Sequence, residues 1–264
     1  MMIDRSAAKA SPIAPRWLRA GLDALYPPTC LACEAPAEAV GGLCAECWRG
    51  VEFIAGRVCD RCGAPLVHED AEAAGTAALT CDGCARWPPA WDRGRAAARY
   101  AAAARTLCLV LKHADRTEAA PPMARWMARA GAPLLAEADL LIPIPLHWTR
   151  RIRRRFNQSA ELARAVSRLS RVPVDGGLLR RVRRTASQDG KNRAQRVDNL
   201  RAAFQVRDGR RLEGATVLLI DDVMTTGATL SAAAETLRPH RPRAIHALCF
   251  ARVSREEEGL ARDL

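Results

Sequence analysis

Two different patterns of hydrophobic and polar residues divide the chain. From residue 95 onward, short apolar runs alternate with segments whose apolar residues recur at helical spacing. The runs predict strands over residues 95–100, 139–143, 216–220 and 244–250, and the periodic segments predict helices over residues 103–111, 122–130, 157–169 and 228–237. Strands that alternate with helices in this way predict an α/β fold, in which a parallel sheet is flanked by helices.

The first third of the chain has few long apolar runs and is organised by cysteines instead. Eight of the ten cysteines form four C-x2-C pairs, separated by 10, 11 and 18 residues. Two thiolates at this spacing can turn onto one tetrahedral ion, and two pairs complete a four-thiolate zinc site. We therefore predict two structural Zn²⁺ sites without an open position for catalysis, with the ligands Cys30, Cys33, Cys44, Cys47, Cys59, Cys62, Cys81 and Cys84.

Sequential pairing is the simplest assignment, with the first four cysteines on one ion and the last four on the other, but interleaved pairing stays open. Disulfides would need an oxidising compartment, whereas the N-terminal residues lack an apolar core of signal-peptide length. A ferredoxin-like cluster is typical of other spacings. The two single cysteines, Cys108 and Cys249, lie in apolar runs and are predicted to be buried.

Composition supports a folded chain of 264 residues, with 49% hydrophobic and 27% charged residues. No run approaches the roughly 18 apolar residues of a membrane span, so we expect no such span and a cytoplasmic location. We predict an N-terminal tail at 1–25, a double zinc-binding domain at 26–92, an α/β domain at 93–255 and a C-terminal tail at 256–264.

The net charge of +12 is unevenly distributed. Residues 1–95 hold 10 basic and 12 acidic side chains, whereas residues 147–196 hold 15 and 3. Only three of the 41 basic residues are lysines, so genome composition accounts for part of this bias. A local excess of this kind favours phosphate-bearing partners. Aromatic residues among arginines also suit single-stranded DNA, for which the candidate contacts are Arg151, Arg153 and Arg154.

The segment VLLIDDVMTTGATL at 217–230 carries the clearest chemistry. Asp221 and Asp222 follow an apolar strand, where ligands bind in open α/β sheets, and adjacent carboxylates can accept hydrogen bonds from a ribose diol. The loop that follows can surround a phosphate with hydroxyls and backbone N–H groups at the start of a helix. Together these features indicate a 5-phosphoribosyl group, with the loop residues Thr225, Thr226, Gly227, Ala228 and Thr229 on the phosphate. Walker A and G-x-G-x-x-G motifs are absent from the sequence.

This segment resembles the phosphoribosyl pyrophosphate motif of type I phosphoribosyltransferases. Combined with the four C-x2-C pairs, the chain resembles the ComF family, which has a double zinc ribbon followed by a phosphoribosyltransferase domain. Further similar stretches are LKHADR at 111–116, IPIPLHWTR at 142–150, RRFNQSAELAR at 154–164 and RRTASQDGKNRAQRVDN at 183–199. The resemblance implies a type I phosphoribosyltransferase-like sheet with a small N-terminal zinc-ribbon domain, in a cytoplasmic bacterial protein associated with competence for transformation.

The resemblance also implies residue roles. Asp221 and Asp222 are candidate catalytic residues that hold the ribose hydroxyls, and Mg²⁺ is held chiefly by the pyrophosphate of the substrate. Lys112 faces the pyrophosphate or forms a solvated helix end. A basic loop over the site would include Arg184 and Arg193, with Thr185, Gln188, Arg196 and Asn199. The family commonly has Gly where this chain has Arg155, which affects the geometry near Asn157 and Gln158.

Two functions follow from these observations. The first is a Mg²⁺-dependent phosphoribosyltransferase that uses phosphoribosyl pyrophosphate and an unknown acceptor. The alternative is a single-stranded DNA-handling protein of DNA uptake that keeps the fold without catalysis, with competence or replication proteins as partners. As a third interpretation, the ribbons form a protein-docking platform. Its apolar residues Trp48, Phe53 and Ile54 would be exposed there, although packing of the two ribbons against each other is the favoured explanation.

Overall fold

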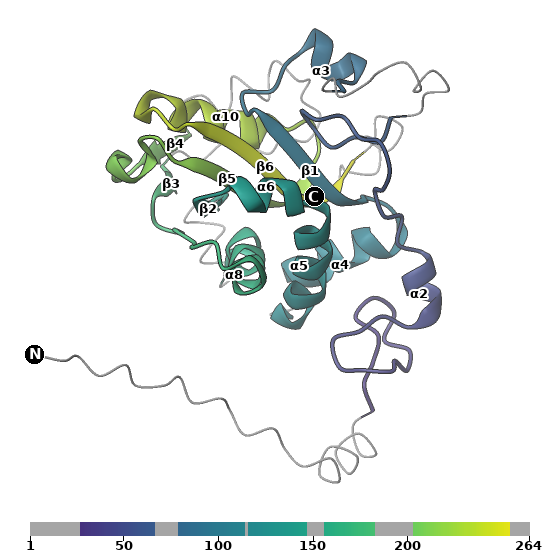
Figure 1. Cartoon of the computed structure of the whole chain (residues 1–264). Helices are drawn as coiled ribbons and strands as arrows, with labels where there is room; N and C mark the ends of the chain where they lie inside the picture. Colours follow the sequence, from purple (N-terminus) through teal and green to yellow (C-terminus); the bar gives the residue numbers. More distant parts are fainter. Residues whose placement is uncertain (1–26, 67–78, 114–115, 147–155, 183–202, 254–264) are drawn as a thin grey trace, which may run out of the picture.

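A four-stranded parallel sheet occupies the centre of the computed structural model, which describes residues 27–66, 79–113, 116–146, 156–182 and 203–253 (Figure 1). Its strands stand in the order β1–β6–β5–β2. The bounds are β1 Arg93–Arg99, β2 Leu140–Pro143, β5 Thr216–Met224 and β6 Ala244–Arg252. All four predicted strands are confirmed. β5 continues four residues beyond its predicted end, so both aspartates of the motif lie inside the strand.

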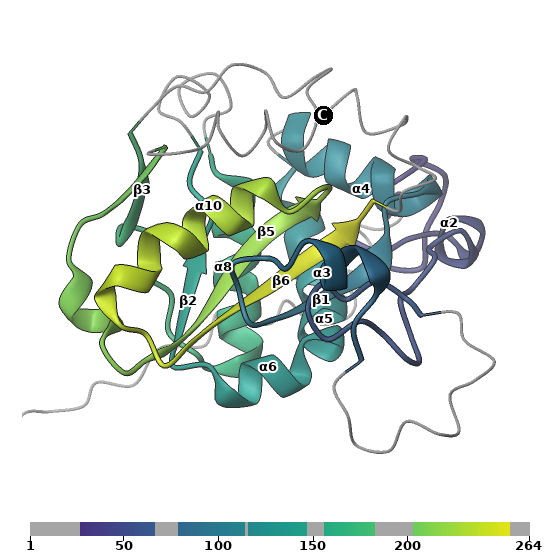
Figure 2. The ribbon, with the colours of Figure 1, turned by 90° about the horizontal axis from the view of Figure 1, so that it is seen from above.

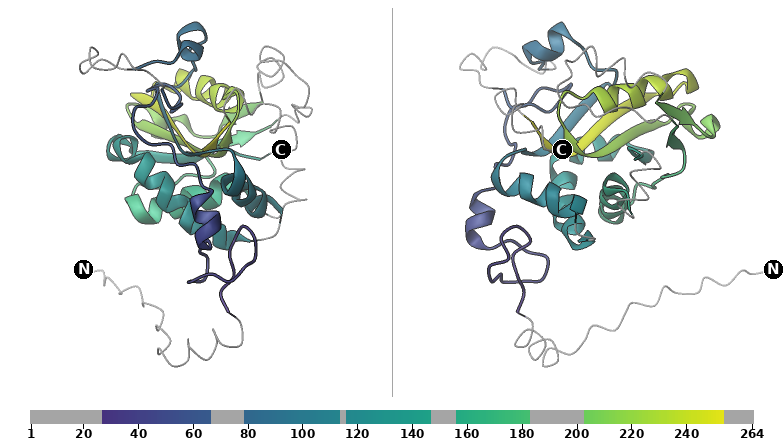
Figure 3. Two further views of the ribbon diagram at one scale, coloured as in Figure 1. Left: turned by 90° about the vertical axis from the view of Figure 1, so that its right-hand side faces the viewer. Right: turned by 180° about the vertical axis from the view of Figure 1, so that it is seen from behind.

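The central strands are apolar on both sides because two cores flank the sheet. Along β5, Val217 and Leu219 belong to one core, and Leu218 and Ile220 belong to the other. α4 Ala102–His113, α5 Ala120–Ala130, α6 Ala132–Glu137 and α8 Gln158–Ser170 cover one side, hereafter the helix-rich face (Figure 3). α10 Ala228–Leu237 covers the opposite side, hereafter the α10 face.

The four predicted helices are confirmed, with ends displaced by two residues or fewer. α8 shows why the local sequence folds this way. The Asn157 side chain accepts a hydrogen bond from the Ser159 N–H at 3.1 Å, which caps the first turn, and Arg171 ends the helix in the left-handed region at φ 64°. Sequence analysis did not predict α6, whose six residues are too few for a clear helical period.

Short elements complete the described fold. β3 Leu179–Arg181 and β4 Phe204–Val206 form an antiparallel pair apart from the main sheet. Three single-turn 3-10 helices, η1 Thr117–Ala119, η2 Gly209–Leu212 and η3 Arg238–His240, lie between larger elements. Sequence analysis predicted none of these, because three or four residues carry too little periodicity. Among the helices of the described ranges, none has the length and apolar character needed to cross a bilayer.

The cysteine-rich region is built from two similar units. TCLACEAP at 29–36 and VCDRCGAP at 58–65 each form a tight loop closed by a β-bridge, between Thr29 and Pro36 and between Val58 and Pro65. The second half of each unit is a C-x2-C pair on a one-turn helix, α2 Ala45–Arg49 or α3 Asp82–Arg86. The sulfur atoms therefore gather sequentially, four in each unit, and the interleaved alternative is wrong for this structure.

The two units lie against opposite faces of the sheet, with α3 above it and α2 below it in Figure 1. Figure 2 looks onto the face that carries α3 and α10. Leu31 and Val51, beside the first cluster, belong to the core of the helix-rich face. Cys59 and Cys62 of the second cluster are themselves part of the core of the α10 face. Both units thus pack closely against the sheet. The first strand of the sheet, β1, begins at Arg93. The domain boundaries proposed from the sequence stay a prediction.

The aromatic residues of the first unit correct one expectation. The sequence favoured packing of the two ribbons against each other through Trp48 and Phe53, and this expectation is wrong. Their rings lie 5.5 and 5.3 Å from that of Trp126 in α5, which in turn stacks on Phe250 of β6 at 5.9 Å. Phe53 also bridges to Ala98 of β1. These rings therefore join the first unit to the sheet domain, but Trp48 and Phe53 stay 49% and 39% exposed, as the docking-platform interpretation expected.

Candidate functional site

The candidate site lies where β5 ends and α10 begins. Asp221 and Asp222 occupy the last part of β5, and Thr225 to Gly227 connect it to the helix. Since all four strands of the sheet are parallel, this is the edge at which their carboxyl ends meet. The structure therefore brings together the two aspartates and the Thr/Gly loop that the sequence selected, and adds side chains from α4 and α8.

Lys112 from α4 forms an ion pair with Asp222, with 3.3 Å between Nζ and Oδ2. Only 9% of the lysine side chain and 13% of the aspartate side chain are exposed, so Lys112 is not a solvated helix end. Burial opposes ionisation of Asp222, but the charge of Lys112 and its hydrogen bond outweigh that effect and lower the pKa of Asp222. Asp222 is therefore ionised at neutral pH and neutralised by a partner from another element.

Asp221 has a different environment. Burial, followed by the negative charge of Asp222, raises its pKa to about 8. Its Oδ1 accepts hydrogen bonds from the Ser159 hydroxyl at 2.8 Å and from the Asp222 N–H at 3.0 Å. The raised pKa of Asp221 and the lowered pKa of Asp222 favour a single negative charge on the pair near neutral pH, and Lys112 lies in position to balance that charge. Sequence analysis did not single out Ser159, although its RRFNQSAELAR stretch was recognised.

The loop after β5 has the backbone of an anion-binding turn. Gly227 has φ +76° and stands at the N-cap of α10, where no side chain caps the helix. Within the described loop, the only hydrogen bond from a backbone N–H to a side chain of the loop is donated by Ala228 to the Thr226 Oγ1, at 3.4 Å. N–H groups of the first helical turn are consequently available to a ligand, and the helix dipole favours a negative one.

Helix α8 contributes its N-terminus to the same edge. The Asn157 amide donates to the carbonyl of Ile144, just beyond β2, at 3.0 Å, which fixes the start of the helix. Gln158 follows it and is only 2% exposed, and its Nε2 has no partner among the described residues. Ser159 then reaches Asp221. Sequence analysis named Asn157 and Gln158 only as neighbours of Arg155, which lies outside the described residues.

Trp91 contacts the loop and was also missed. A Cβ placed on Gly227 would lie 2.5 Å from the outer carbon of the Trp91 indole ring, so ring and loop are in direct contact. Trp91 is 2% exposed and belongs to the core that contains Cys59 and Cys62. The Trp-Pro-Pro-Ala-Trp run at 87–91 was the available signal, but it marks only the end of the cysteine region.

Both cysteine clusters fit tetrahedral zinc. In each, four sulfur atoms lie within 4.8 Å of one another. The Cys33–Cys44 and Cys62–Cys81 sulfur atoms are 3.6 and 3.7 Å apart, close to the roughly 3.8 Å that four thiolates on one Zn²⁺ at about 2.3 Å require. The clusters differ in burial, since Cys33 is exposed whereas Cys59, Cys62 and Cys84 are buried. Four thiolates leave no position for substrate, which indicates a structural role.

The remaining predicted residues fall into two groups, those that the structure describes and those outside the described ranges. Cys108 and Cys249 are fully buried, as expected. The basic candidates lie outside the described residues: Arg184 and Arg193 for the pyrophosphate loop, and Arg151, Arg153 and Arg154 for nucleic acid.

Comparison with known proteins agrees with this architecture. A double zinc ribbon domain matches residues 21–85, and a phosphoribosyl transferase domain matches residues 128–261. DNA utilization protein YhgH of Escherichia coli K12 is 31% identical over 234 residues, which cover 86% of this chain and 97% of that protein. The chain belongs to the ComF family. Within it, competence protein F of Haemophilus influenzae is 28% identical over 76% of this chain and 86% of its own length.

Among solved structures, TT1426 of Thermus thermophilus aligns with 55% of this ComF family chain and 78% of its own, at 19% identity and a TM-score of 0.32. The expected fold class is confirmed: a parallel sheet flanked by helices, with a phosphoribosyltransferase domain and an N-terminal zinc-ribbon region.

Proposed function

We propose that this ComF family protein binds phosphoribosyl pyrophosphate together with Mg²⁺ and transfers its phosphoribosyl group to an acceptor that the sequence does not identify. The observation that carries the proposal is the junction of β5 and α10, where two carboxylates precede an uncapped helix N-terminus. A ribose 5-phosphate presents a diol and a dianion in one molecule. The carboxylates suit the diol, and the N–H groups of Thr229 and Leu230 suit the dianion.

Charge supports the same ligand. Two ionised aspartates would repel a phosphate, but the raised pKa of Asp221 and the Lys112 ion pair leave the pair and its partner without net charge at neutral pH. Protonated Asp221 can also donate a hydrogen bond to a ribose oxygen, while Ser159 fixes the orientation of its carboxyl group. The role of the aspartates is therefore to orient the ribose.

Mg²⁺ would enter with the pyrophosphate, which supplies most of its oxygen ligands, and would withdraw charge from the leaving group. Carboxylate oxygens at this edge are suitable additional ligands. Lys112 lies on the same edge, and its positive charge suits the pyrophosphate. Arg184 and Arg193 remain proposals for the same task.

Calorimetric titration of phosphoribosyl pyrophosphate, with and without Mg²⁺, tests the proposal. The decisive variant is Asp221→Asn, because Asp222→Asn would also leave Lys112 buried without its partner. We expect binding to wild type and at least a tenfold loss in the variant, since hydrogen bonds to a buried ligand contribute roughly 1–3 kcal/mol. No binding to wild type would refute the proposal.

The chain offers a matched control at the other end of β5. Asp139 accepts a hydrogen bond from the Thr216 N–H at 2.8 Å, on the amino-terminal edge of the sheet. Asp139→Asn makes the same substitution beside the same pair of strands without touching the candidate site. It is expected to bind phosphoribosyl pyrophosphate as wild type does, and equal loss in both variants would mean that the effect is one of stability.

A second function has its own support. Relatives bear the names DNA utilization protein and competence protein F, and residues 147–196 have a large excess of positive charge. We propose binding of single-stranded DNA as the alternative, with competence or replication proteins as partners and a cytoplasmic location, which stays a prediction. Affinity should fall steeply with salt, and reversal of Arg151, Arg153 and Arg154 to Glu should abolish it. Salt-independent binding, or binding retained after reversal, would contradict this function.

A further inference from the structure

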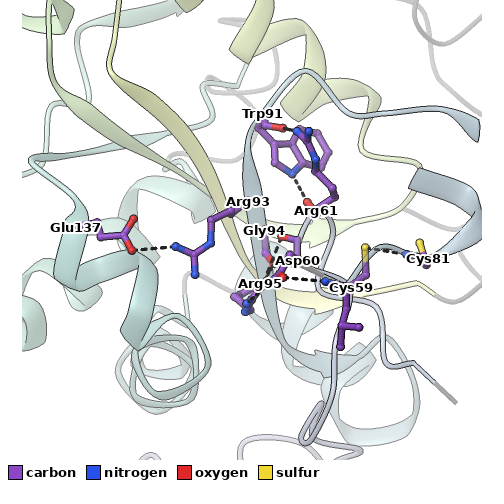
Figure 4. Close-up of polar contacts among 10 residues, drawn as sticks. Cys59, Asp60, Arg61, Cys81, Trp91, Arg93, Gly94, Arg95 and Glu137 are labelled. Atoms are coloured by element: carbon purple, nitrogen blue, oxygen red, sulfur yellow. Dashed lines mark hydrogen bonds and ion pairs between the residues drawn. The ribbon is translucent and has the colours of Figure 1, made fainter. Parts of the chain in front are cut away.

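Trp91 connects the second cysteine cluster to the loop at residues 225–227, which we propose binds the phosphate and call the phosphate-binding loop, by direct contacts at both ends of its side chain. At one end, the outer edge of its six-membered ring lies against Gly227, where a Cβ would be only 2.5 Å from the ring. At the other end, the indole N–H donates to the carbonyl of Arg61 at 2.6 Å (Figure 4). Arg61 is one of the two residues between Cys59 and Cys62. A single rigid ring therefore spans from a metal-ligand loop to a candidate ligand loop.

The contacts at the cysteine end leave Trp91 little freedom. The Arg61 guanidinium donates back to the Trp91 carbonyl at 3.2 Å, so the two residues are joined by reciprocal hydrogen bonds. Gly94 approaches both of them: a Cβ there would lie 2.7 Å from the Arg61 carbonyl oxygen and 3.0 Å from the indole nitrogen. Asp60, the other residue between the cysteines, pairs with Arg95 at 2.7 Å and accepts from the Gly94 N–H at 2.8 Å. The C-x2-C turn and the start of β1 therefore hold the ring from both sides.

A second connection runs parallel to the first. Arg252, at the end of β6, donates to the carbonyl of Cys62 at 3.1 Å and contacts the sulfur of Met224 at the same distance. Met224 is the last residue of β5 before the loop. The residue before Trp91 is also held by the end of α10, because Arg238 at the C-cap of this helix donates to the Ala90 carbonyl at 3.0 Å. The second cluster thus supports the loop at Gly227 and at the residue where β5 ends.

The first cluster has no comparable route among the described residues. Its neighbours Leu31, Trp48 and Phe53 pack on the helix-rich face, whereas Gly227 and Trp91 lie on the α10 face. This asymmetry makes a specific prediction possible, because the same change made in the two clusters should have different consequences at the loop.

We propose that Trp91 is a positioning residue for the phosphate-binding loop, and that an intact second cysteine cluster, through Trp91, holds Gly227 in the conformation that accepts a 5-phosphate. The ligand part of this inference rests on the proposed function. The mechanical part does not, because it concerns the order of the loop in the free protein. Zinc in the second cluster would fix the Cys59–Cys62 turn, and the turn would fix the ring.

Hydrogen exchange of backbone amides in residues 223–231 of the full chain tests the mechanical part. Cys84→Ser in the second cluster is compared with Cys47→Ser in the first, with zinc content measured for both. We expect both variants to lose zinc. Only Cys84→Ser should increase exchange of this loop, and the increase should be about tenfold greater than any increase in residues 140–142 of β2. Equal loop exchange in the two variants would overturn the proposal.

Substitution of the ring itself tests the role of Trp91 separately from the metal. Trp91→Phe keeps an aromatic ring but lacks the indole N–H, and Trp91→Ala removes the ring. Trp48→Ala is the matched control, since Trp48 packs beside the first cluster and is half exposed. Loop exchange should rise in the order wild type, Trp91→Phe, Trp91→Ala, and should be unchanged in Trp48→Ala. Wild-type exchange in Trp91→Phe would count against the proposal even if Trp91→Ala does not fold.

Affinity for ribose 5-phosphate tests the ligand part. We expect Trp91→Ala to weaken it about tenfold or more, Trp91→Phe to recover most of the loss, and Trp48→Ala to match wild type. If wild type does not bind ribose 5-phosphate or phosphoribosyl pyrophosphate, the proposed function fails. If wild type binds and Trp91→Ala binds equally well, the proposed function stands and the role of Trp91 is wrong.

Discussion

The two cysteine units have the same sequence pattern and the same local fold, but they meet different parts of the molecule. The first unit lies at the edge of the helix-rich face, and Cys33 is exposed to solvent. In the second unit, Cys59, Cys62 and Cys84 are buried in the core of the α10 face, beside Trp91 and the start of α10. Two copies of one zinc-binding motif can therefore differ in function because of the surfaces on which they pack.

The largest effect should come from the clusters themselves. We expect Cys62→Ser to lower the melting temperature far more than Cys33→Ser, although each should remove one equivalent of zinc. Structural Zn²⁺ contributes roughly 10–16 kcal/mol of binding free energy. Three ligands of the second cluster are buried in the core of the α10 face, whereas Cys33 of the first cluster is exposed. Metal analysis and thermal unfolding of both variants provide the measurement. Equal losses of stability would show that the burial difference has no energetic consequence.

The next effect concerns the ion pair that reaches the site from the helix-rich face. Lys112→Met should destabilise the protein by about 3–5 kcal/mol, because it leaves Asp222 buried without its partner. The double variant Lys112→Met with Asp222→Asn should recover most of that loss. Chemical denaturation of the four proteins of this double-mutant cycle measures the coupling. Additive losses would contradict the ion pair and would mean that Lys112, on the helix-rich face, has no energetic coupling to Asp222 in the site.

A smaller effect is expected at the contact between the second unit and the loop. Gly227→Ala places a methyl group 2.5 Å from the Trp91 ring at a residue with φ +76°, which should cost about 1–3 kcal/mol of stability. Gly56 has nearly the same φ, 75°, and nothing lies within 4 Å of its added Cβ, so Gly56→Ala is the matched control for backbone strain alone. Equal effects in the two variants would mean that the contact with Trp91 is unimportant.

The last prediction is a pH dependence of stability. Because the pKa of Asp221 in the folded protein, about 8, lies above the usual 3.8, the folded state retains a proton that the unfolded chain releases. Stability from this group is complete below pH 4 and is lost as the pH rises toward 8. Asp221→Asn removes that loss, so its melting temperature relative to wild type should increase between pH 4 and pH 8. A constant difference across this range would contradict the raised pKa.

The sequence predicted those features that depend on local spacing. Buried runs gave the four strands, helical periods gave four helices, and C-x2-C pairs gave both four-cysteine clusters. The motif at 217–230 located the aspartates and the loop, because strand, turn and helix are contiguous there. Each of these predictions needs information from no more than a few tens of residues.

The sequence did not predict contacts between distant segments. Ser159 reaches Asp221 across 62 positions, and Arg252 reaches Cys62 across 190. The helical and strand periods of the sequence do not predict such pairs, because the pairs depend on how the helices and the cysteine units pack on the sheet. The same reason explains the wrong expectation for Trp48 and Phe53, whose apolar character was correctly recognised but whose partner, Trp126, could not be identified from spacing.

The order of the strands also has a consequence for how the chain is made. β1 is an edge strand of the four-stranded sheet, in which it pairs with β6, the last strand. During synthesis the second cysteine unit and β1 leave the ribosome about 150 residues before that neighbour, so they must wait while the rest of the domain emerges. Such a long separation between contacting segments slows folding and exposes an unpaired strand edge. Early binding of zinc by the two cysteine units would keep the chain before β1 compact until β6 has been synthesised.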